Sequence, residues 1–495
     1  MSSSLQNSLQ QLCSDLIAIE LPLNVKVTGI AVDSRQVKPG DLFFAFKGQQ
    51  VDSRQYCNDA LSKGAVAVIS EGEPSLTFEQ GKPIITIADI MPKMAKIAAR
   101  FYDDPTQDLS VIGITGTNGK TSCSQWLAQA LSQCGISCGV IGTLGWGLPS
   151  ELHPLENTTP GPILLQEIAH TLLQQGTHAL AMEVSSHALV QHRVDAVKFD
   201  TAVFTNLTRD HLDYHQDMAT YAAAKWQLFL KPELRYAIIN IDDPYGLQYL
   251  TQLPSQVQGF GYSLSNDLAI KQPCVRANIM TQDSRGFKIH FVTPWGEGLL
   301  QTNLMGRFNV SNLCAVLTSL GVQGIPLNQA LTALAELNSV PGRMECLGGN
   351  GLPRVVIDFA HTPDALAQVL KALRKHCSAK LWCVFGCGGD RDKGKRPLMG
   401  QIAEQLADSV VLTQDNSRSE DPLTIISHIR QGMQDVTARV ELDRAAAIHF
   451  AIAAAQVNDL ILIAGKGHEN YQEIAGKRHP FSDTLQAKLG LAKRV

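Results

Sequence analysis

The chain contains 495 residues, of which 44% are hydrophobic, and its formal net charge at pH 7 is −4. This length predicts about three domains, and this apolar content excludes a largely disordered protein. Because there is no basic excess, the composition argues against a nucleic-acid-binding protein, and we expect no nucleic acid partner.

The cysteines and the first residues of the chain indicate a reducing compartment. Eleven cysteines occur without a CxxC pair, which indicates free thiols rather than a disulfide framework. The opening MSSSLQNSLQQLCSDL has neither the basic region nor the apolar core of a signal peptide. No apolar run is long enough to cross a bilayer. We therefore expect a cytoplasmic protein without membrane insertion.

Residues 1–104 are predicted to form a small N-terminal α/β domain. Alternating or apolar runs predict strands at 25–32, 42–46, 64–70 and 82–87, with a turn at Lys38-Pro39-Gly40-Asp41. The polar triplet at 33–35 follows the first of these strands. From the pattern alone, this triplet suits contact with a ligand and a simple turn equally well.

The glycine-rich stretch at residues 111–122, VIGITGTNGKTS, predicts a phosphate-binding loop. A strand at 111–114 precedes the loop and a helix at about 122–132 follows it, as in known loops of this kind. Gly116 and Gly119 would turn backbone N–H groups toward the phosphates. Lys120 would reach the outer phosphates, and Thr121 would bind Mg²⁺. Ile114 stands where the common motif has glycine, and the competing interpretation is a glycine-rich turn with a surface lysine.

Three residues further along the central region, 105–338, are candidates for a metal site. Glu183 ends a predicted strand, 179–184, where it would hold Mg²⁺ or merely cap the strand. His211 follows another predicted strand, 201–206, and is either a ligand or a structural hydrogen-bonding residue. Lys225 lies in a predicted helix, 221–229. Its side chain either extends to solvent or is buried with a lowered pKa, which gives a neutral amine that CO₂ can convert to a carbamate ligand of Mg²⁺.

The rest of the central region shows weaker patterns. Residues 236–301 are predicted to be rich in strands, with candidates at 236–240 and 287–292. A helix is expected from GRFNVSN, 306–312, onward, with Asn309 or Asn312 as its N-cap. Pro341-Gly342 marks the boundary of a third domain, 339–495. Arg343, at this boundary, would either contact a phosphate or remain a solvated charge.

The third domain is predicted to be Rossmann-like. Four apolar strands, at 354–359, 381–385, 409–413 and 460–464, are each followed by a polar loop, and Thr362-Pro363 is a good start for a helix. Ligands bind at the carboxyl ends of parallel strands. These loops should therefore form one crevice with Arg391, Asn416, Arg418 and Glu469. Two arginines and a glutamate suit an amino acid. The alternative for GCGGDRDKGKR, 386–396, is a solvated basic loop.

These regions together predict an α/β enzyme of three domains. They are a small N-terminal α/β domain, a central P-loop ATPase-like parallel sheet and a C-terminal Rossmann-like domain. An ATP-binding loop, a metal site and an amino-acid crevice suit carboxylate activation. The γ-phosphoryl group of ATP would move to a carboxylate, and an amine would then displace phosphate to form an amide.

The order of these motifs resembles that of the Mur ligase family. The resemblance extends over essentially the whole chain and is carried by TGTNGKTS, ENTTP, MEVSSHALVQHRVD, FTNLTRDHLDYH, YAAAKW, GRFNVSN, PGRME, IDFAHTPDAL, FGCGGDRDKGKRPLM, DNSR and GKGHE. It implies an ATP- and Mg²⁺-dependent ligase that adds meso-2,6-diaminopimelate to the D-glutamate γ-carboxyl of UDP-N-acetylmuramoyl-L-alanyl-D-glutamate. Such an enzyme acts in cytoplasmic peptidoglycan precursor synthesis, releases ADP and phosphate, and is expected here as a monomer.

The resemblance also implies roles for individual residues, motif by motif. ATP would be bound by Gly116, Thr117, Asn118, Gly119, Lys120, Thr121, Ser122, Asn309, Arg343, Asp358 and His361. The UDP-linked dipeptide would be bound by Val32, Ser34, Gln49, Gln50, Val51, Asn157, Thr158, Thr159, Ser185, Gln191 and Arg193. Diaminopimelate would be bound by Arg391, Asp415, Asn416, Ser417, Arg418, Gly465 and Glu469. Mg²⁺ would be held by Thr121, Glu183, His211 and carbamylated Lys225, and catalysis would rest on Lys120, Lys225, His211 and Glu183.

The sequence DNSR, 415–418, departs from the family's usual DNPR. Ser417 replaces a proline that stiffens this loop, so we expect a looser loop. Asn416 and Arg418 are retained, and an arginine suits the distal carboxylate of diaminopimelate, which lysine lacks. We therefore expect diaminopimelate rather than L-lysine as the acceptor.

Four other assignments compete with this one. A ligase that adds L-lysine at the same step differs only in its acceptor. A folylpolyglutamate synthase is disfavoured by the full N-terminal domain and by DNSR. A P-loop ATPase that drives a switch would turn over ATP without an acceptor amine. A non-catalytic binding protein is disfavoured by the intact Lys120 and Thr121.

Overall fold

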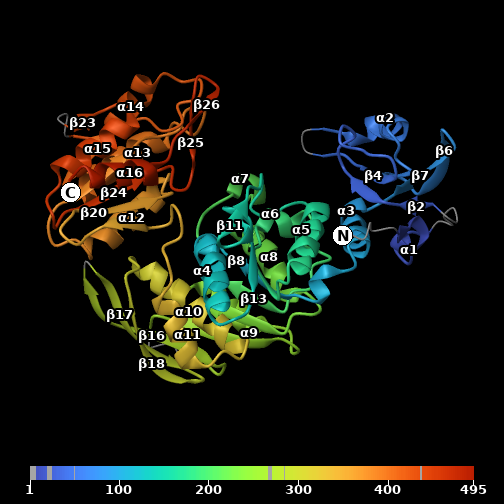
Figure 1. Cartoon of the computed structure of the whole chain (residues 1–495), viewed down its shortest axis with the longest axis horizontal. Coiled ribbons are helices and arrows are strands. Elements are labelled where there is room, and N and C mark those ends of the chain that lie inside the picture. Colours follow the sequence, from blue (N-terminus) through green and yellow to red (C-terminus); the bar gives the residue numbers. More distant parts are fainter. Residues whose placement is uncertain are drawn as a thin grey trace. The chain divides into compact units, whose positions relative to one another are not determined.

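The computed structural model (Figure 1) describes residues 7–18, 25–48, 51–265, 270–283, 285–434 and 438–494. The chain divides into two compact units, Met1–Ser124 with Leu131–Phe260 and Gln125–Ala130 with Gly261–Val495. Helices and largely parallel sheets confirm the α/β class, and the boundaries of the three domains stay a prediction. No helix in the described ranges is both long and apolar enough to cross a membrane.

The N-terminal sheet of the first unit has the strand order β3-β4-β5-β7-β6. β3 (Gly29–Ala31), β4 (Asp41–Ala45), β5 (Ala67–Glu71) and β7 (Lys82–Ile87) are parallel, and β6 (Ser75–Glu79) pairs antiparallel with β7. Around it are β1 (Asn7–Ser8), α1 (Leu9–Cys13), β2 (Lys26–Val27), η1 (Ser53–Tyr56), α2 (Cys57–Ser62) and α3 (Ile90–Phe101). Met94 and Ile97 of α3 pack with Phe44 and Ile69 in one buried apolar cluster.

Two predicted strands of this region have different bounds. The strand expected at 25–32 is split, because β2 pairs with β1 whereas β3 pairs with β4. The strand expected from Gly64 begins three residues later. Gly64 has a φ of 110°, and the N–H of Ala65 donates to the carbonyl of Ala60 (3.0 Å). This bond and the positive φ of Gly64 close the end of α2 before the strand can start.

The larger sheet of the first unit runs in the order β11-β10-β9-β12-β8-β13-β14-β15. Its strands are β8 (Ser110–Thr115), β9 (Cys138–Gly142), β10 (Gly145–Leu148), β11 (Glu151–His153), β12 (Ala179–Glu183), β13 (Thr201–Phe204), β14 (Tyr236–Asn240) and β15 (Gln258–Ser263). β9, β12, β8, β13 and β14 are parallel. The register pairs Glu183 with Ile114 and Phe204 with Thr115, so the carboxyl ends of β8, β12 and β13 share one edge.

Helices and short 3₁₀ turns follow the strands of this sheet. They are η2 (Pro105–Gln107), α4 (Lys120–Gln133), α5 (Pro162–Gln174), α6 (Ser186–Val190), α7 (Leu212–His215), α8 (Met218–Trp226), η3 (Gln227–Leu230) and α9 (Pro244–Gln252). Helix α9 lies in the stretch predicted to be rich in strands. Asp243 caps it by accepting from the N–H groups of Tyr245 and Gly246, and Pro244 is its first residue. This Asp-Pro start is a sequence signal of a helix.

The second unit begins with antiparallel strands and two helices. β16 (Cys274–Asp283), β17 (Gly286–Thr293) and β18 (Gly296–Thr302) are followed by α10 (Arg307–Val322) and α11 (Leu327–Ala335). The N-cap of α10 is Gly306, so the expectation that Asn309 or Asn312 caps this helix is wrong. Both are buried inside the helix. Asn309 Nδ2 donates to the carbonyl of Met305 (2.8 Å), and Asn312 Nδ2 donates to Asn309 Oδ1 (3.2 Å).

The C-terminal sheet of the second unit runs in the order β19-β20-β24-β21-β22-β23. β20 (Arg354–Asp358), β24 (Leu460–Ala464), β21 (Leu381–Phe385), β22 (Ser409–Leu412) and β23 (Arg439–Val440) are parallel, and β19 (Glu345–Gly348) is antiparallel. Its helices are α12 (Pro363–Arg374), α13 (Lys395–Leu406), α14 (Pro422–Arg430), α15 (Arg444–Ala454) and α16 (Asp483–Ala492), and β25 (Tyr471–Ile474) pairs with β26 (Lys477–Pro480). Thr362 caps α12 with Pro363 as its first residue, as predicted.

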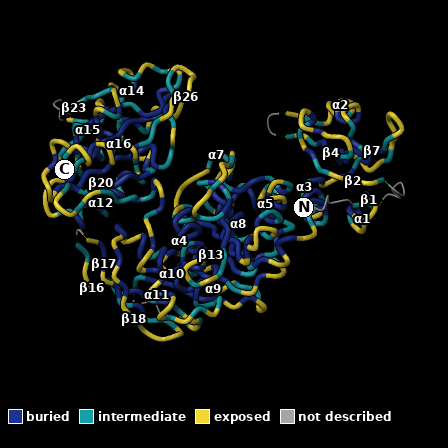
Figure 2. The backbone as a smooth tube through the Cα atoms, in the orientation of Figure 1, coloured by how far each residue is buried: buried dark blue, intermediate teal, exposed yellow. Residues whose placement is uncertain are grey.

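Helices cover both faces of this sheet. Successive side chains of a strand point to opposite faces. Leu460 and Leu462 of β24 accordingly join an apolar cluster with residues of α12, α13 and α14, whereas Ile461 and Ile463 join a second cluster with residues of α15 and α16. The strands are buried between these layers (Figure 2). This is the doubly wound arrangement expected of a Rossmann-like domain.

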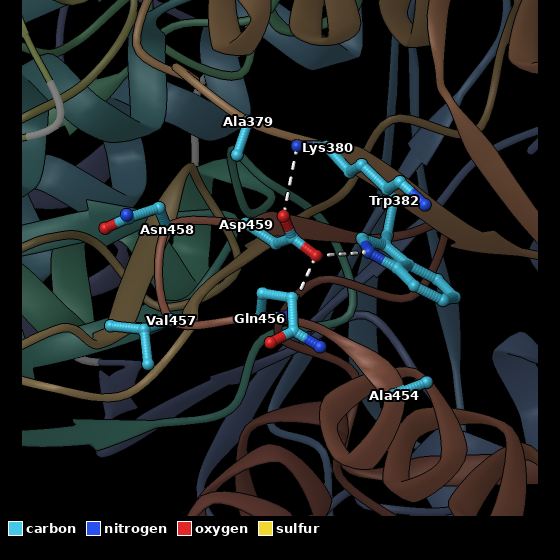
Figure 3. Close-up of a pocket in the computed structure, with 8 residues that line it drawn as sticks. All are labelled: Ala379, Lys380, Trp382, Ala454, Gln456, Val457, Asn458 and Asp459. Carbon is cyan, nitrogen blue, oxygen red and sulfur yellow. Dashed lines mark hydrogen bonds between the residues drawn. The ribbon is translucent and has the colours of Figure 1, made fainter.

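A buried carboxylate aligns the amino ends of β21 and β24 (Figure 3). The carboxylate of Asp459 accepts from the backbone N–H of Lys380 (3.0 Å) and of Gln456 (2.8 Å), and from Trp382 Nε1 (3.1 Å). The cavity around it lies at the ends of the strands opposite the predicted ligand loops. Its acidic group is already fully hydrogen-bonded, so we assign it a structural role.

Candidate functional site

The predicted phosphate loop joins β8 to α4 and has glycine at two positions where the backbone adopts a positive φ. Gly116 and Gly119 have φ values of 144° and 90°, which residues with side chains rarely adopt. A Cβ atom on Gly116 would lie 1.9 Å from Thr205 Oγ1. Helix α4 begins at Lys120, two residues earlier than predicted. The loop therefore runs directly into a helix N-terminus, which favours anions.

Polar residues after β13 hold this loop in place. Thr205 Oγ1 donates to the carbonyl of Asn118 (2.6 Å), and Asn206 Oδ1 accepts from the N–H of Asn118 (3.0 Å). The N–H of Thr117 donates to the carbonyl of Asn206 (2.8 Å). Thr205 and Asn206 are absent from the predicted site. Their position at the carboxyl end of the strand beside the loop is the signal that identifies them.

Two of the predicted Mg²⁺ ligands are in direct contact at this edge. Thr121 Oγ1 donates to Glu183 Oε2 (3.0 Å), and the N–H of Thr143 donates to Glu183 Oε1 (2.8 Å). Hydroxyl and carboxylate oxygens are the donors that Mg²⁺ prefers, so this pair fits the ion. Among the described residues, no three His, Cys, Asp or Glu side chains are grouped to hold a metal. An ion here would need further ligands, such as phosphate oxygens.

Lys225, in α8, is buried, with only 1% of its surface exposed. Its Nζ donates to the carbonyl of Gly116 (2.9 Å), which also accepts from Lys120 Nζ (2.9 Å). Burial, and then the charge of Lys120, lowers the pKa of Lys225 well below its ordinary value, and the charge of Asp210 opposes this. Of the two alternatives left open for Lys225, the structure therefore supports the buried, weakly basic amine.

A cluster of rings packs beside Lys225. Its Nζ lies 4.5 Å from the centre of the Tyr221 ring, and the His211 ring lies 6.2 Å from that of Tyr221, centre to centre. His187 lies 5.0 Å from His211, and His215 lies 5.0 Å from Tyr221. His211, the predicted metal ligand, is exposed and lies at the edge of this cluster. Its backbone φ is 52°. His187, His215 and Tyr221 are absent from the predicted site.

Five of the eleven residues predicted to bind the UDP-linked dipeptide belong to one hydrogen-bonded network around Glu183. Thr159 Oγ1 donates to the carbonyl of Glu183 (2.8 Å) and accepts from the N–H of Ser185 (3.1 Å). Arg193 donates to the carbonyl of Thr159 (2.8 Å) and to Gln191 Oε1 (2.6 Å). The hydroxyls of Thr158 and Thr143 lie 3.1 Å apart, and Asn157 is exposed. The network thus adjoins the predicted metal ligands.

The described residues predicted to contact the uridine end lie in loops that follow β3 and β4 of the N-terminal sheet. Val32 and Val51 are 43% and 54% exposed, whereas Ser34 is buried. Gln49 and Gln50 lie outside the described residues. Val32 directly follows β3, at the end of a parallel strand where ligands commonly bind, and the role of these residues stays a prediction.

Three residues predicted to lie near ATP cluster in the second unit. The Arg343 guanidinium lies 4.9 Å from the centre of the Phe359 ring, and its Nε is buried without a partner in the described part of the chain. Asp358 Oδ2 accepts from the N–H of Met344 (2.8 Å), and His361 Nδ1 lies 2.8 Å from the Phe359 carbonyl. Burial raises the pKa of Asp358 and lowers that of His361. An unpartnered buried donor such as Arg343 Nε is a group that a ligand can satisfy.

The loops after β21, β22 and β24 approach one another closely, as predicted. A Cβ atom on Gly389 would lie 1.9 Å from the carbonyl oxygen of Ser417, and one on Gly465 would lie 2.6 Å from Asp415 Oδ2. Arg418 Nη1 donates to the carbonyl of Gly389 (2.7 Å). The glycine half of the segment, 386–389, therefore packs against DNSR, whereas residues 390–394 are exposed, so the alternative of a solvated basic loop still describes that part.

Of the residues predicted to bind the amino acid, Asn416 and Glu469 are in direct contact. Asn416 Nδ2 donates to Glu469 Oε2 (2.9 Å), and Arg391 is exposed on the loop that Arg418 contacts. Ser417 is buried, and its Oγ has no hydrogen-bond partner in the described residues. The N–H of Arg418 donates to the carbonyl of Glu473 (3.0 Å). A main-chain bond to β25 thus supports the loop in which serine replaces proline.

Three buried cations that contact these loops or the strand ends before them are absent from the predicted site. Arg396 Nη2 donates to the carbonyl of Gly388 (3.1 Å) and to Glu420 Oε1 (2.8 Å). Arg444 Nη2 donates to the carbonyl of Ala464 (3.0 Å) and pairs with Asp483. Lys466 is fully buried beside Asn416. A charged residue within GKGHE or GCGGDRDKGKR is a candidate for the site from the sequence alone. Whether its side chain points inward depends on tertiary packing.

Three family models match successive parts of the chain. Residues 26–102 match the model described as Mur ligase family, catalytic domain. Residues 114–320 match the Mur ligase middle domain, and residues 342–467 match the Mur ligase, glutamate ligase domain.

Known proteins match over nearly the full length. One from Coxiella burnetii, named UDP-N-acetylmuramoyl-L-alanyl-D-glutamate–2,6-diaminopimelate ligase, is 50% identical over 473 residues, which cover 95% of this chain and 97% of that protein. One from Pseudomonas aeruginosa with the same name is 48% identical over 494 residues, 99% of both chains. A solved structure with this name is 37% identical, covers 99% of both chains and has a TM-score of 0.75.

Proposed function

The chain belongs to the Mur ligase family, and from this premise we propose that it adds meso-2,6-diaminopimelate to UDP-N-acetylmuramoyl-L-alanyl-D-glutamate at the expense of ATP. The observation that carries the proposal is the 48–50% identity, over nearly the whole chain, to two ligases bearing that name. The intact phosphate loop and the arginine-containing crevice supply groups of the kind that this reaction needs.

The proposed reaction has two steps. A γ-carboxylate oxygen of the D-glutamate attacks the γ-phosphorus of ATP, so that ADP leaves and an acyl phosphate forms. An uncharged amino group of diaminopimelate then attacks the acyl carbon, phosphate leaves, and the amine loses a proton. Lys120 and the N-terminal N–H groups of α4 stabilise negative charge on the transferred phosphoryl group. The Thr159–Arg193 network orients the carboxylate substrate.

Mg²⁺ fits the edge where β8 and β12 end. Thr121 and Glu183 would hold the ion, with His211 and a carbamate on Lys225 as further ligands. The ion would neutralise charge on the β- and γ-phosphates. The low basicity of Lys225 supports the carbamate, because an uncharged amine is the form that reacts with CO₂.

The crevice of the second unit is proposed to bind diaminopimelate. Arg391 and Arg418 would bind carboxylates, and Glu469 would bind an ammonium group. Arginine at 418 favours an acceptor with a second carboxylate over L-lysine. We further propose that the enzyme acts as a monomer in the cytoplasm.

The test is product formation with purified protein, ATP, Mg²⁺ and the UDP-linked dipeptide. Meso-diaminopimelate and L-lysine are supplied separately, and the products are identified by mass spectrometry. We expect the diaminopimelate tripeptide to form at least about tenfold faster than the lysine product. A tenfold difference corresponds to a free-energy difference of about 1.4 kcal/mol between the two acceptors. A lysine product formed faster would contradict the assignment of Arg418, and no product with either acceptor would contradict the proposed reaction.

A further inference from the structure

Lys466 has an unusual environment for a lysine in a loop. It follows β24, is fully buried, and its Nζ donates to Asn416 Oδ1 (3.0 Å) and to Glu469 Oε2 (2.7 Å). A buried ammonium group is costly unless it is paired, and a lysine in a surface loop ordinarily extends to solvent. Its inward direction therefore calls for an explanation.

The backbone around Lys466 favours this inward direction. Gly465 and Gly467, on either side, have φ values of 115° and 53°. A Cβ atom on Gly467 would lie 2.8 Å from the Cβ of Phe359. Because glycine alone adopts these conformations at little cost, the loop can turn sharply and direct Lys466 toward Asn416.

Lys466 sets the orientation of the Asn416 amide. Asn416 Oδ1 accepts from Lys466 Nζ and also from the backbone N–H of Glu473 (2.9 Å). Because both of these groups are donors, the Asn416 atom that they contact must be the amide oxygen and not the amide nitrogen. Asn416 Nδ2 is consequently directed to Glu469 Oε2, to which it donates at 2.9 Å.

The same arrangement leaves one oxygen of Glu469 available. Oε2 accepts from both Lys466 and Asn416, whereas Oε1 has no hydrogen-bond partner among the residues that the structure describes. The side chain of Glu469 is 23% exposed. One carboxylate oxygen is thus held by the protein, and the other is left for a ligand.

We propose that Lys466 is a positioning residue of the amino-acid crevice, which with Asn416 holds Glu469 Oε2 so that Oε1 accepts from an ammonium group of the incoming amino acid. This inference rests on the proposed function of the crevice. It separates two roles within GKGHE: Glu469 contacts the amino acid, and Lys466 acts through Glu469.

The first test replaces Lys466 by methionine, which keeps the side-chain length but removes the ammonium group. We expect the KM for meso-diaminopimelate to rise about 10- to 100-fold, the range for lost hydrogen bonds to charged groups. The KM values for ATP and for the UDP-linked dipeptide should stay within about twofold. The control is Lys477→Met, because Lys477 is exposed on β26. An unchanged KM for diaminopimelate, or equal rises for all three substrates, would overturn the proposal.

A double-mutant cycle keeps the proposal testable if Lys466→Met loses stability by leaving the Glu469 charge without its partner. The cycle combines Lys466→Met with Glu469→Gln, which removes that charge. If Lys466 acts through Glu469, the double variant has the KM for diaminopimelate of Glu469→Gln alone. Independent effects that multiply would contradict this mechanism. Failure of the unmodified protein to form product with any acceptor would instead contradict the proposed function.

Discussion

The phosphate loop of the first unit and the amino-acid crevice of the second are held in place by different means. Neutral hydroxyl and amide groups of Thr205 and Asn206 fix the phosphate loop. Lys120 and, from α8, Lys225 both donate to the carbonyl of Gly116. The crevice instead has buried cations paired with acids, such as Lys466 with Glu469. In the proposed function, ATP would be bound largely by backbone geometry, whereas the amino acid would be distinguished from others by charged side chains.

Replacement of Lys225 should have the largest effect on the phosphate-loop side of this comparison. Lys225→Ala is expected to lower the rate of ligation by more than about 100-fold. The change removes a proposed ligand of the Mg²⁺ ion that would stabilise charge on the transferred phosphoryl group. Added bicarbonate should not restore activity. Lys96→Ala, on the exposed face of α3, is the control. Full activity in Lys225→Ala would contradict the carbamate role.

A side chain at Gly116 should damage the same region through the backbone. Gly116→Ala places a Cβ atom 1.9 Å from Thr205 Oγ1 at a φ of 144°. We expect the KM for ATP to rise at least about tenfold and the free energy of unfolding to fall by about 1–3 kcal/mol. Gly161→Ala is the control, because a Cβ atom there meets no atom within 4 Å. Steady-state kinetics with varied ATP and urea unfolding would measure the two effects, and unchanged values would contradict the argument.

Replacement of Arg418 should affect the crevice alone. Because Arg418 has a φ of 50°, asparagine is a better replacement than alanine, since it tolerates this backbone conformation. Arg418→Asn is expected to raise the KM for meso-diaminopimelate about 10- to 100-fold by removing a charged hydrogen bond to a carboxylate. Steady-state kinetics should show little change for ATP. An equal loss for the UDP-linked dipeptide would contradict the assignment.

The smallest expected effect is a pH dependence of stability in the second unit. Burial, and then the charge of Arg343, lowers the pKa of His468 to about 4. Since this is below the unfolded value of about 6.5, the neutral ring contributes stability above that value, and this contribution is lost as the pH falls toward 4. Linkage predicts a loss of about 2 kcal/mol by pH 5.

Urea unfolding between pH 7 and pH 5 would measure this loss in the unmodified protein and in His468→Phe. The phenylalanine variant should lose less stability over this range, because it has no ring to protonate. His479→Phe, at an exposed position on β26, is the control. The same pH dependence in all three proteins would contradict the role of His468.

Features that depend on neighbouring residues could be predicted from the sequence. β7, β21 and β24 have the predicted bounds because each is an apolar run between turn residues. The phosphate loop is likewise contained in one short stretch, and the topology rule for parallel strands was enough to bring Asn416 and Glu469 together. The Asp243 cap of α9 was also readable from the sequence, although a strand-rich stretch was expected there.

Features that depend on tertiary packing could not be predicted. The burial of Lys225 follows from its contact with Gly116, which is 109 residues away in the chain. The inward direction of Lys466 depends on Asn416, 50 residues away. In both cases the sequence shows a lysine with two permitted directions, and only the surrounding structure decides between a solvated charge and a buried one.

The most direct test of the account is the release of phosphate with ATP, Mg²⁺ and the UDP-linked dipeptide, with and without meso-diaminopimelate. If the two sites serve one ligation, phosphate is released only when the amino acid is present, with one phosphate for each tripeptide formed. Equal phosphate release without the amino acid would contradict this account and would indicate an ATPase that uses the phosphate loop independently of the crevice.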